Sequence, residues 1–238
     1  MAAEGRPLFR HLLAELENDI QAMAAAAERL FEKAVGALDG HDPAVYRAVI
    51  AGDDEVDAFY LRIEQRVTDL FALQSPIVAS DLRLLTALLH INGHLERVAD
   101  QAVNIAKIGA AAQRLPRSPG VLEQLDEMAS LALRMLEAAM DAFARRDAEL
   151  SRRLPPMDEP IDELNRGMLK DVLAAAGNED LLRWCVSMHM VSRQIERVGD
   201  HAVDIGEQVA YLVTGEFQEF TDASHPEIEH PELAAGVE

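Results

Sequence analysis

One segment of the chain occurs twice, about a hundred residues apart, and this repeat constrains the fold more than any other feature. Positions 96–105 and 196–205 carry the same residue at seven of ten places, within LERVADQAVNIAK and IERVGDHAVDIGEQ. In both copies apolar residues recur every three or four positions, which is the period of an amphipathic helix. A spacing near 100 is too long for a solenoid unit and indicates two copies of one helical domain.

The helical period extends over nearly the whole chain, and turn residues divide it into segments. RLPRSPG (114–120) is the clearest linker, because it holds two prolines and a glycine. Three long helices precede this linker and three follow it, so we expect an all-α fold of two homologous, antiparallel, spectrin-repeat-like three-helix bundles. A single six-helix array stays open, because the pattern does not show how the halves dock. The expected parts are a first bundle at 8–113, a second at 119–214 and an acidic, mobile tail at 215–238.

Several helix ends can be predicted from capping chemistry. A capping side chain followed by proline suits the first turn of a helix, and it occurs at three places: Asp42–Pro43, Ser75–Pro76 and Ser118–Pro119. Gly177–Asn178 should end the fifth helix and cap the sixth. LPPMDEP (154–160) should break or kink the fifth helix, since an interior proline costs about 3 kcal/mol.

The charge balance narrows the function. The chain holds 42 acidic and 22 basic residues, a formal charge of −20. This disfavours general nucleic-acid binding and adsorption to anionic lipid, both of which need basic surface. It suits binding of cations or of a basic protein face, although solubility alone explains much of it. The lone Cys185 excludes an internal disulfide, and no run of apolar residues is long enough to span a membrane, so we expect a cytoplasmic protein that is not membrane-inserted.

The repeated helix carries acids at i, i+4 spacing, which places them on one face. The pair is Glu96 and Asp100 in the first copy; the second copy has Glu196, Asp200 and Asp204. Like charges at this spacing repel by about 0.2–0.5 kcal/mol for each pair, so the acidic face destabilises the helix unless a cation neutralises it. In so acidic a chain such pairs also arise by chance, and taken singly each is more often a solvated face.

The positions of two further acid pairs strengthen the hypothesis that these acids bind a metal ion. The preceding helix of each half carries a second acid pair at the same spacing, Asp53 with Asp57 and Asp158 with Asp162. Adjacent helices can bring two such pairs together, which would gather four carboxylates in each half. Oxygen-only ligands favour hard ions such as iron, manganese, magnesium or calcium over zinc.

These residues resemble the PhoU family, the accessory and regulatory proteins of bacterial phosphate uptake. The likeness rests on LERVADQAVNIA and IERVGDHAVDIG and on the acid pairs upstream, and it covers nearly the whole ordered chain. It implies paired E(D)xxxD metal motifs, here Asp53, Asp57, Glu96, Asp100, Asp158, Asp162, Glu196 and Asp200. The family pattern often continues to an asparagine. Asn104 fits, whereas Asp204 departs. It adds a carboxylate as a ninth candidate metal ligand, which predicts two unequal sites.

The resemblance also implies a role without catalysis. It implies a homodimer or larger assembly that holds metal, often multinuclear iron, with manganese, zinc and magnesium as alternatives. It implies a negative regulator that lies between the ATPase subunit of the high-affinity phosphate transporter and a membrane sensor histidine kinase. Such a regulator keeps the phosphate-starvation genes off when phosphate is plentiful.

Two other readings remain. A di-iron enzyme would need Glu-x-x-His pairs in the bundle core, and Glu227–His230 in the tail is the one such pair in the sequence. A metal-free helical adaptor is the second. Among the histidines, His189 is a candidate fifth ligand or an ordinary hydrogen-bonding group, whereas His90 and His94 are expected at the surface. Arg83 and Arg193 are candidates to brace the carboxylates.

Overall fold

The protein is all-helical in its computed structural model, which describes residues 5–40, 42–73 and 78–220. Six long helices confirm the predicted fold class, and the described residues form no strand. Three shorter elements are η1 (Ala37–Asp39), α5 (Ala148–Ser151) and η2 (Ala175–Gly177). The long helices are α1 (Gly5–Gly36), α2 (Pro43–Leu73), α3 (Ala79–Ala112), α4 (Pro119–Arg145), α6 (Leu154–Ala174) and α7 (Glu179–Thr214).

Side-chain caps begin several helices, as capping chemistry predicts. Asp42 Oδ1 accepts the Ala44 amide at 2.8 Å at the start of α2. Asn178 Oδ1 accepts the Leu181 amide at 3.1 Å at the start of α7. Ser118 precedes α4 without a side-chain cap. The predicted cap at 75 and the predicted tail beyond 220 lie outside the described residues.

The fifth helical segment is interrupted, although the break precedes the prolines. Arg146 adopts a left-handed conformation with φ 57° and ends α4. The short α5 follows, and α6 begins at Leu154, so that two prolines occupy its first turn. Proline is favourable there because its missing N–H would have no intrahelical partner. Only Pro160 lies inside α6.

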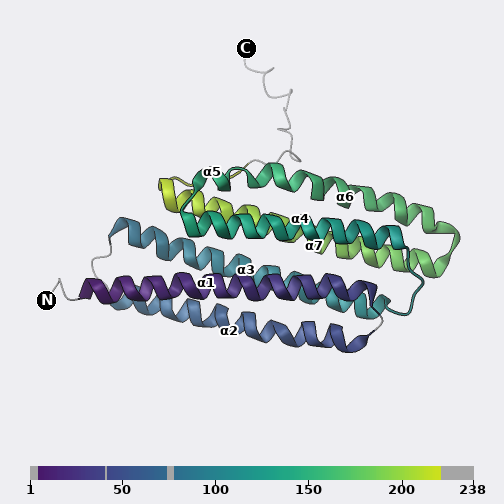
Figure 1. Cartoon of the computed structure of the whole chain (residues 1–238), viewed down its shortest axis with the longest axis horizontal. Coiled ribbons are helices and arrows are strands. Elements are labelled where there is room, and N and C mark those ends of the chain that lie inside the picture. Colours follow the sequence, from purple (N-terminus) through teal and green to yellow (C-terminus); the bar gives the residue numbers. More distant parts are fainter. Residues whose placement is uncertain (1–4, 41, 74–77, 221–238) are drawn as a thin grey trace, which may run out of the picture.

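The two halves pack through their repeated helices. Figure 1 shows α1, α2 and α3 on one side of a common long axis and α4 to α7 on the other. The junction is formed mainly by α3 against α7, with a smaller contact of α1 with α4. Buried apolar side chains of both halves, such as Leu95 and Ile195, belong to one continuous core. The repeated helices are therefore buried on several sides, which leaves only a narrow face of each for polar groups.

The repeated helices run antiparallel, and their contacts are nearly symmetric. Asn104 of α3 donates from Nδ2 to Gln194 Oε1 of α7 at 3.3 Å. Asp204 Oδ2 of α7 lies 3.3 Å from His94 Nδ1 of α3. Because position i of the first copy corresponds to i + 100 of the second, these contacts exchange equivalent positions. The junction therefore has a pseudo-twofold axis.

Candidate metal centres

The first acid group lies where α2 faces α3. Asp53 and Asp57 come from α2, and Glu96 and Asp100 from α3. Burial raises the pKa of Asp53, and the charges of Asp57 and Asp100 raise it further. Burial and then Asp100 raise the pKa of Glu96, with smaller contributions from Asp57 and Asp53. The four carboxylates are thus close enough to destabilise one another's charged forms.

One arginine partly neutralises the first group. Arg97 lies 3.0 Å from Asp100 Oδ2 through Nη1 and 3.5 Å from Glu96 Oε2 through Nε. The Arg97 side chain is 60% exposed, so solvent and salt weaken these pairs. The repulsion within the group is therefore only partly offset by the chain itself.

The second acid group lies where α6 faces α7. Burial raises the pKa of Asp200 to about 6, and Glu196 is the next largest cause, with Asp162 and Asp204 adding to it. Although Asp200 is exposed to solvent on one side, the surrounding protein removes much of its hydration. Arg193 comes no closer than 3.9 Å to Glu196. The predicted brace from Arg193 is therefore a long, weak ion pair.

A glycine makes room for the remaining acid of this group. Asp158 is buried, with 5% of its surface exposed. Its Oδ1 lies directly against Gly199 of α7, where any side chain would collide with it. The equivalent position of the first copy is Ala99. The second half thus accommodates a buried carboxylate on α6 beside the Glu196–Asp200 face.

Neither acid group is gathered as tightly as a closed metal site. Within the described residues, no three of these acids each bring a carboxylate oxygen within 4.8 Å of the other two. The donor type fits hard cations, and each half places acids of two adjacent helices in electrostatic contact. The groups are therefore open clusters of carboxylates that repel one another.

Asp204 lies in a different environment from the other acids. Its Oδ2 is 3.3 Å from His94 Nδ1 and 3.4 Å from His201 Nδ1. The sequence prediction that His94 is a surface residue is wrong, because docking of α7 onto α3 leaves its side chain only 25% exposed. Burial lowers the pKa of His94, and Asp204 opposes this shift. His201, which sequence reasoning missed, is 19% exposed.

The other singled-out side chains lie outside these groups. Arg83 is beside Gly215, after the C-terminal end of α7, and does not brace the carboxylates. His189 has a buried Nδ1 that makes no hydrogen bond within the described residues. The only Glu-x-x-His sequence, Glu227–His230, lies beyond the described part of the chain.

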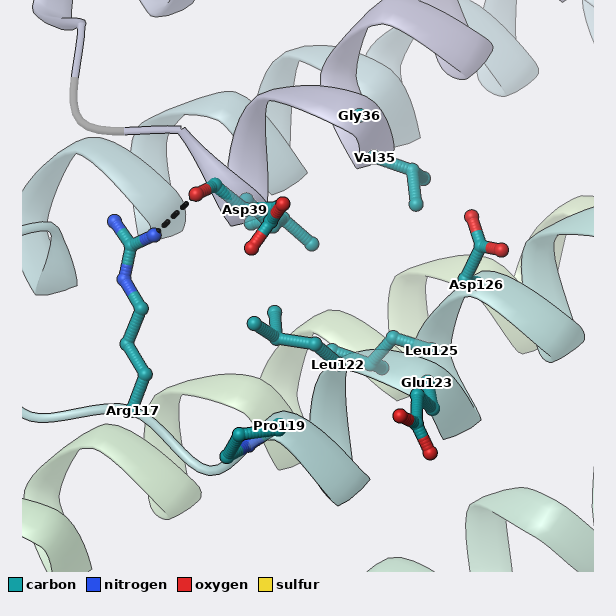
Figure 2. Close-up of a pocket in the computed structure, with 10 residues that line it drawn as sticks. Val35, Gly36, Asp39, Arg117, Pro119, Leu122, Glu123, Leu125 and Asp126 are labelled. Atoms are coloured by element: carbon teal, nitrogen blue, oxygen red, sulfur yellow. Dashed lines mark hydrogen bonds between the residues drawn. The ribbon is translucent and has the colours of Figure 1, made fainter.

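A depression elsewhere on the described part of the chain is lined by none of these acids. It has a volume of about 670 Å³ and lies between the end of α1 and the start of α4. Arg117 of the linker donates to the Asp39 carbonyl oxygen at 2.7 Å, as Figure 2 shows. Asp39, Glu123 and Asp126 line the depression. Its charged and apolar lining residues come from both halves, so the depression marks the joint between them.

The fold and the acid groups define a doubled three-helix protein with one carboxylate face in each half. The PhoU domain model matches residues 20–109 and 125–209, once in each half. The chain therefore belongs to the PhoU family. No described helix has the length and apolar character needed to cross a membrane.

Relatives match over almost their full length. The phosphate-specific transport system accessory protein PhoU homolog of Clostridium acetobutylicum is 28% identical, over 91% of this chain and 99% of the relative. The Rhizobium meliloti homolog is 31% identical, over 87% of each. The crystal structure of PhoU from Pseudomonas aeruginosa has a TM-score of 0.81 at 28% identity, covering 87% of this chain and all of that one. The phosphate transport system regulatory protein PhoU from Streptococcus pneumoniae has a TM-score of 0.79 at 27% identity, with 89% and 99% covered.

Proposed function

We propose that this chain is an accessory and regulatory protein of phosphate transport. It acts as a cytoplasmic negative regulator between the transporter ATPase subunit and a sensor histidine kinase, without a catalytic step of its own. The observation that carries the proposal is the PhoU domain match in both halves, together with relatives named as accessory proteins over nearly their full length. The formal charge of −20 and the elongated helical surface suit docking onto basic faces of such partners.

The second part of the proposal is metal binding by the two acid groups. In the first half the ligands are Asp53, Asp57, Glu96 and Asp100. In the second half they are Asp158, Asp162, Glu196 and Asp200. Iron is the first choice, with manganese, zinc and magnesium as alternatives, and four carboxylates in each half suffice for more than one ion. Burial, and after it the repulsion between neighbouring carboxylates, raises the pKa of Glu96 and Asp200, and a bound cation would relieve that repulsion.

A complementation assay tests the regulatory role. The chain is expressed in a bacterium that lacks its own PhoU and carries a reporter of the phosphate-starvation response. In phosphate-rich medium we expect the reporter to fall to the level of the parent strain. Reporter activity that stays as high as in the deletion strain, with the chain folded and abundant, would contradict the proposal. Homodimer formation is checked separately by light scattering.

Elemental analysis of protein purified without chelator tests the metal part. We expect bound iron or manganese. A Glu96→Gln, Asp100→Asn double variant should lose the metal of the first half and keep that of the second, since the two groups lie on different helix pairs. Metal-free protein that complements fully would support the adaptor without metal and reject this part alone.

A further inference from the structure

The junction between the two halves holds a cluster that differs in chemistry from the acid groups. His94 of α3 and His201 and Asp204 of α7 each offer a ligand atom, and these three atoms lie within 4.8 Å of one another. Among the described residues, this is the only group of three or more potential metal-ligating side chains that meets this limit. Two imidazoles and one carboxylate suit borderline metals such as zinc, in contrast to the hard ions that four carboxylates prefer.

Two of the three distances between ligand atoms match those of a tetrahedral site. Asp204 Oδ2 lies 3.3 Å from His94 Nδ1 and 3.4 Å from His201 Nδ1. Both separations exceed the usual 2.7–3.2 Å or so of a protein N–H···O hydrogen bond. Ligands held about 2.0–2.1 Å from zinc at tetrahedral angles are about 3.3–3.4 Å apart. The two imidazole rings are tilted by 45° with their centroids 5.6 Å apart, which leaves them unstacked.

The cluster is both supported and accessible. The His94 and His201 side chains are 25% and 19% exposed, so packing restricts their rotamers, whereas Asp204 is 42% exposed. Beside them is a shallow depression of about 380 Å³, lined in part by Leu89, His90 and Gly93. It gives an ion a route from solvent and leaves space for a water as fourth ligand.

The pseudo-twofold axis supplies an internal comparison. The positions equivalent to His94, His201 and Asp204 are Gln194, Gln101 and Asn104. On that side of the junction Asn104 donates to Gln194, and every one of the three side chains is a neutral amide. The same backbone junction is therefore built once with amides and once with metal-ligating groups. Interhelical packing alone does not require the ionisable set.

We propose that His94, His201 and Asp204 form a binding site for a divalent transition metal of the zinc type, bridging the two halves. The inference does not depend on the proposed function, because it uses none of the eight acids assigned above. The bound ion would replace the two long histidine–carboxylate contacts by three coordinate bonds. It would thereby fix α3 against α7.

The test uses the full chain, freed of metal with chelator and titrated with Zn²⁺ by calorimetry. The informative variants are His94→Gln and Asp204→Asn, which install the residues that the chain already carries at the equivalent positions 194 and 104. His90→Gln is the matched control, since His90 borders the same depression outside the cluster. Each cluster variant should lose one zinc equivalent or bind it at least 10–100-fold more weakly, the loss typical of even an outer-shell partner. His90→Gln should bind as the parent does.

Two further measurements decide the origin of any zinc signal. X-ray absorption of the one-equivalent zinc complex should show two imidazole ligands, and these should disappear in His94→Gln. A Glu96→Gln, Asp100→Asn variant should keep this zinc, which separates the cluster from the first acid group. Zinc bound equally by parent and cluster variants, or coordinated by oxygen alone, would overturn the proposal. So would a parent protein that binds no zinc while its circular dichroism shows it folded.

Discussion

Asp200→Asn should stabilise the metal-free protein at neutral and alkaline pH. Burial and the Glu196 charge raise the pKa of Asp200 from 3.8 to about 6 in the folded state. A raised carboxyl pKa means that folding favours the protonated form and penalises the charged form. The penalty is absent below about pH 4, grows between about pH 4 and pH 6, and is complete above that range. Asparagine keeps a similar shape without the charge and removes the penalty.

The size of the effect follows from the pKa of Asp200. A rise from 3.8 to about 6 corresponds to about 3 kcal/mol at roughly 1.4 kcal/mol for each tenfold change in proton affinity. Asp200 is more than a third exposed, so solvent screening reduces this figure. We therefore expect Asp200→Asn to gain about 1 kcal/mol in the free energy of unfolding near pH 8 and close to nothing near pH 4.

The equivalent position of the first half gives the matched control. Asp100 forms a 3.0 Å ion pair with Arg97, whereas no described basic side chain forms an ion pair with Asp200. Asp100→Asn removes an attraction along with a repulsion, so it should give no comparable gain. Urea unfolding followed by circular dichroism, in chelator at both pH values, measures each variant against the parent. An Asp200→Asn protein no more stable than the parent near pH 8 would refute the electrostatic account of this face.

Three further outcomes are expected. Replacing Glu196 and Asp200 together by alanine should remove about half of the bound metal, as measured by elemental analysis, and full occupancy would show that these residues are not ligands. Gly109→Ala would place its Cβ 2.7 Å from a buried tyrosine ring and should lower the free energy of unfolding by about 1–3 kcal/mol. Gly93→Ala on the same helix meets nothing within 4 Å and should raise it by about 0.5–1 kcal/mol. Urea unfolding curves that order the two variants the other way would contradict the packing. Asp147→Ala removes a side chain that caps two amides at 3.0 Å and should lower the free energy of unfolding by about 1 kcal/mol, a loss that Asp147→Asn should largely avoid.

The helices and most of their ends follow from the sequence because they depend on local chemistry. The caps at Asp42 and Asn178 act within three residues, and the apolar period gives each helix its buried face. The interruption of the fifth segment was predicted at the prolines of 154–160, and it lies just before them. Proline has two local preferences, breaking a helix from inside and opening one at its first turn. The turn at Arg152 and Arg153, between α5 and α6, decides between them, because it places the first two prolines in the first turn of α6.

The sequence predicts which residues form the acid groups better than it predicts the distances between them. Spacing of four residues places Glu96 with Asp100 on one helix, but it says nothing about the distance to the next helix. That distance depends on how closely the side chains of the two helices pack. Within the described residues, no three acids of either group each bring an oxygen within 4.8 Å of the other two. Gly199, next to Asp200, was the one sequence hint of close approach. It replaces Ala99 of the first copy and makes room for Asp158.

Helical periodicity could not predict the histidine cluster, because His201 and Asp204 lie 107 and 110 positions after His94 along the chain. A stronger assumption would have found it. If the two repeated helices dock antiparallel about a twofold axis, a residue i of one copy faces 298 − i of the other, as Asn104 faces Gln194. The same rule pairs His94 with Asp204, and the turn spacing of α7 adds His201.

This geometry gives the departure of Asp204 from the family pattern a different meaning. In sequence, Asp204 extends the acid stripe of the second copy and predicts a richer carboxylate site there. In the structure its ion-pair partners are the histidines of the junction, so the extra negative charge lies at the contact between the halves. His94 is two residues from Glu96, and His201 directly follows Asp200. A shift of α3 on α7 at this cluster would therefore act within two residues of both acid groups. The three amide side chains at the equivalent positions carry no charge on which an ion or a proton could act.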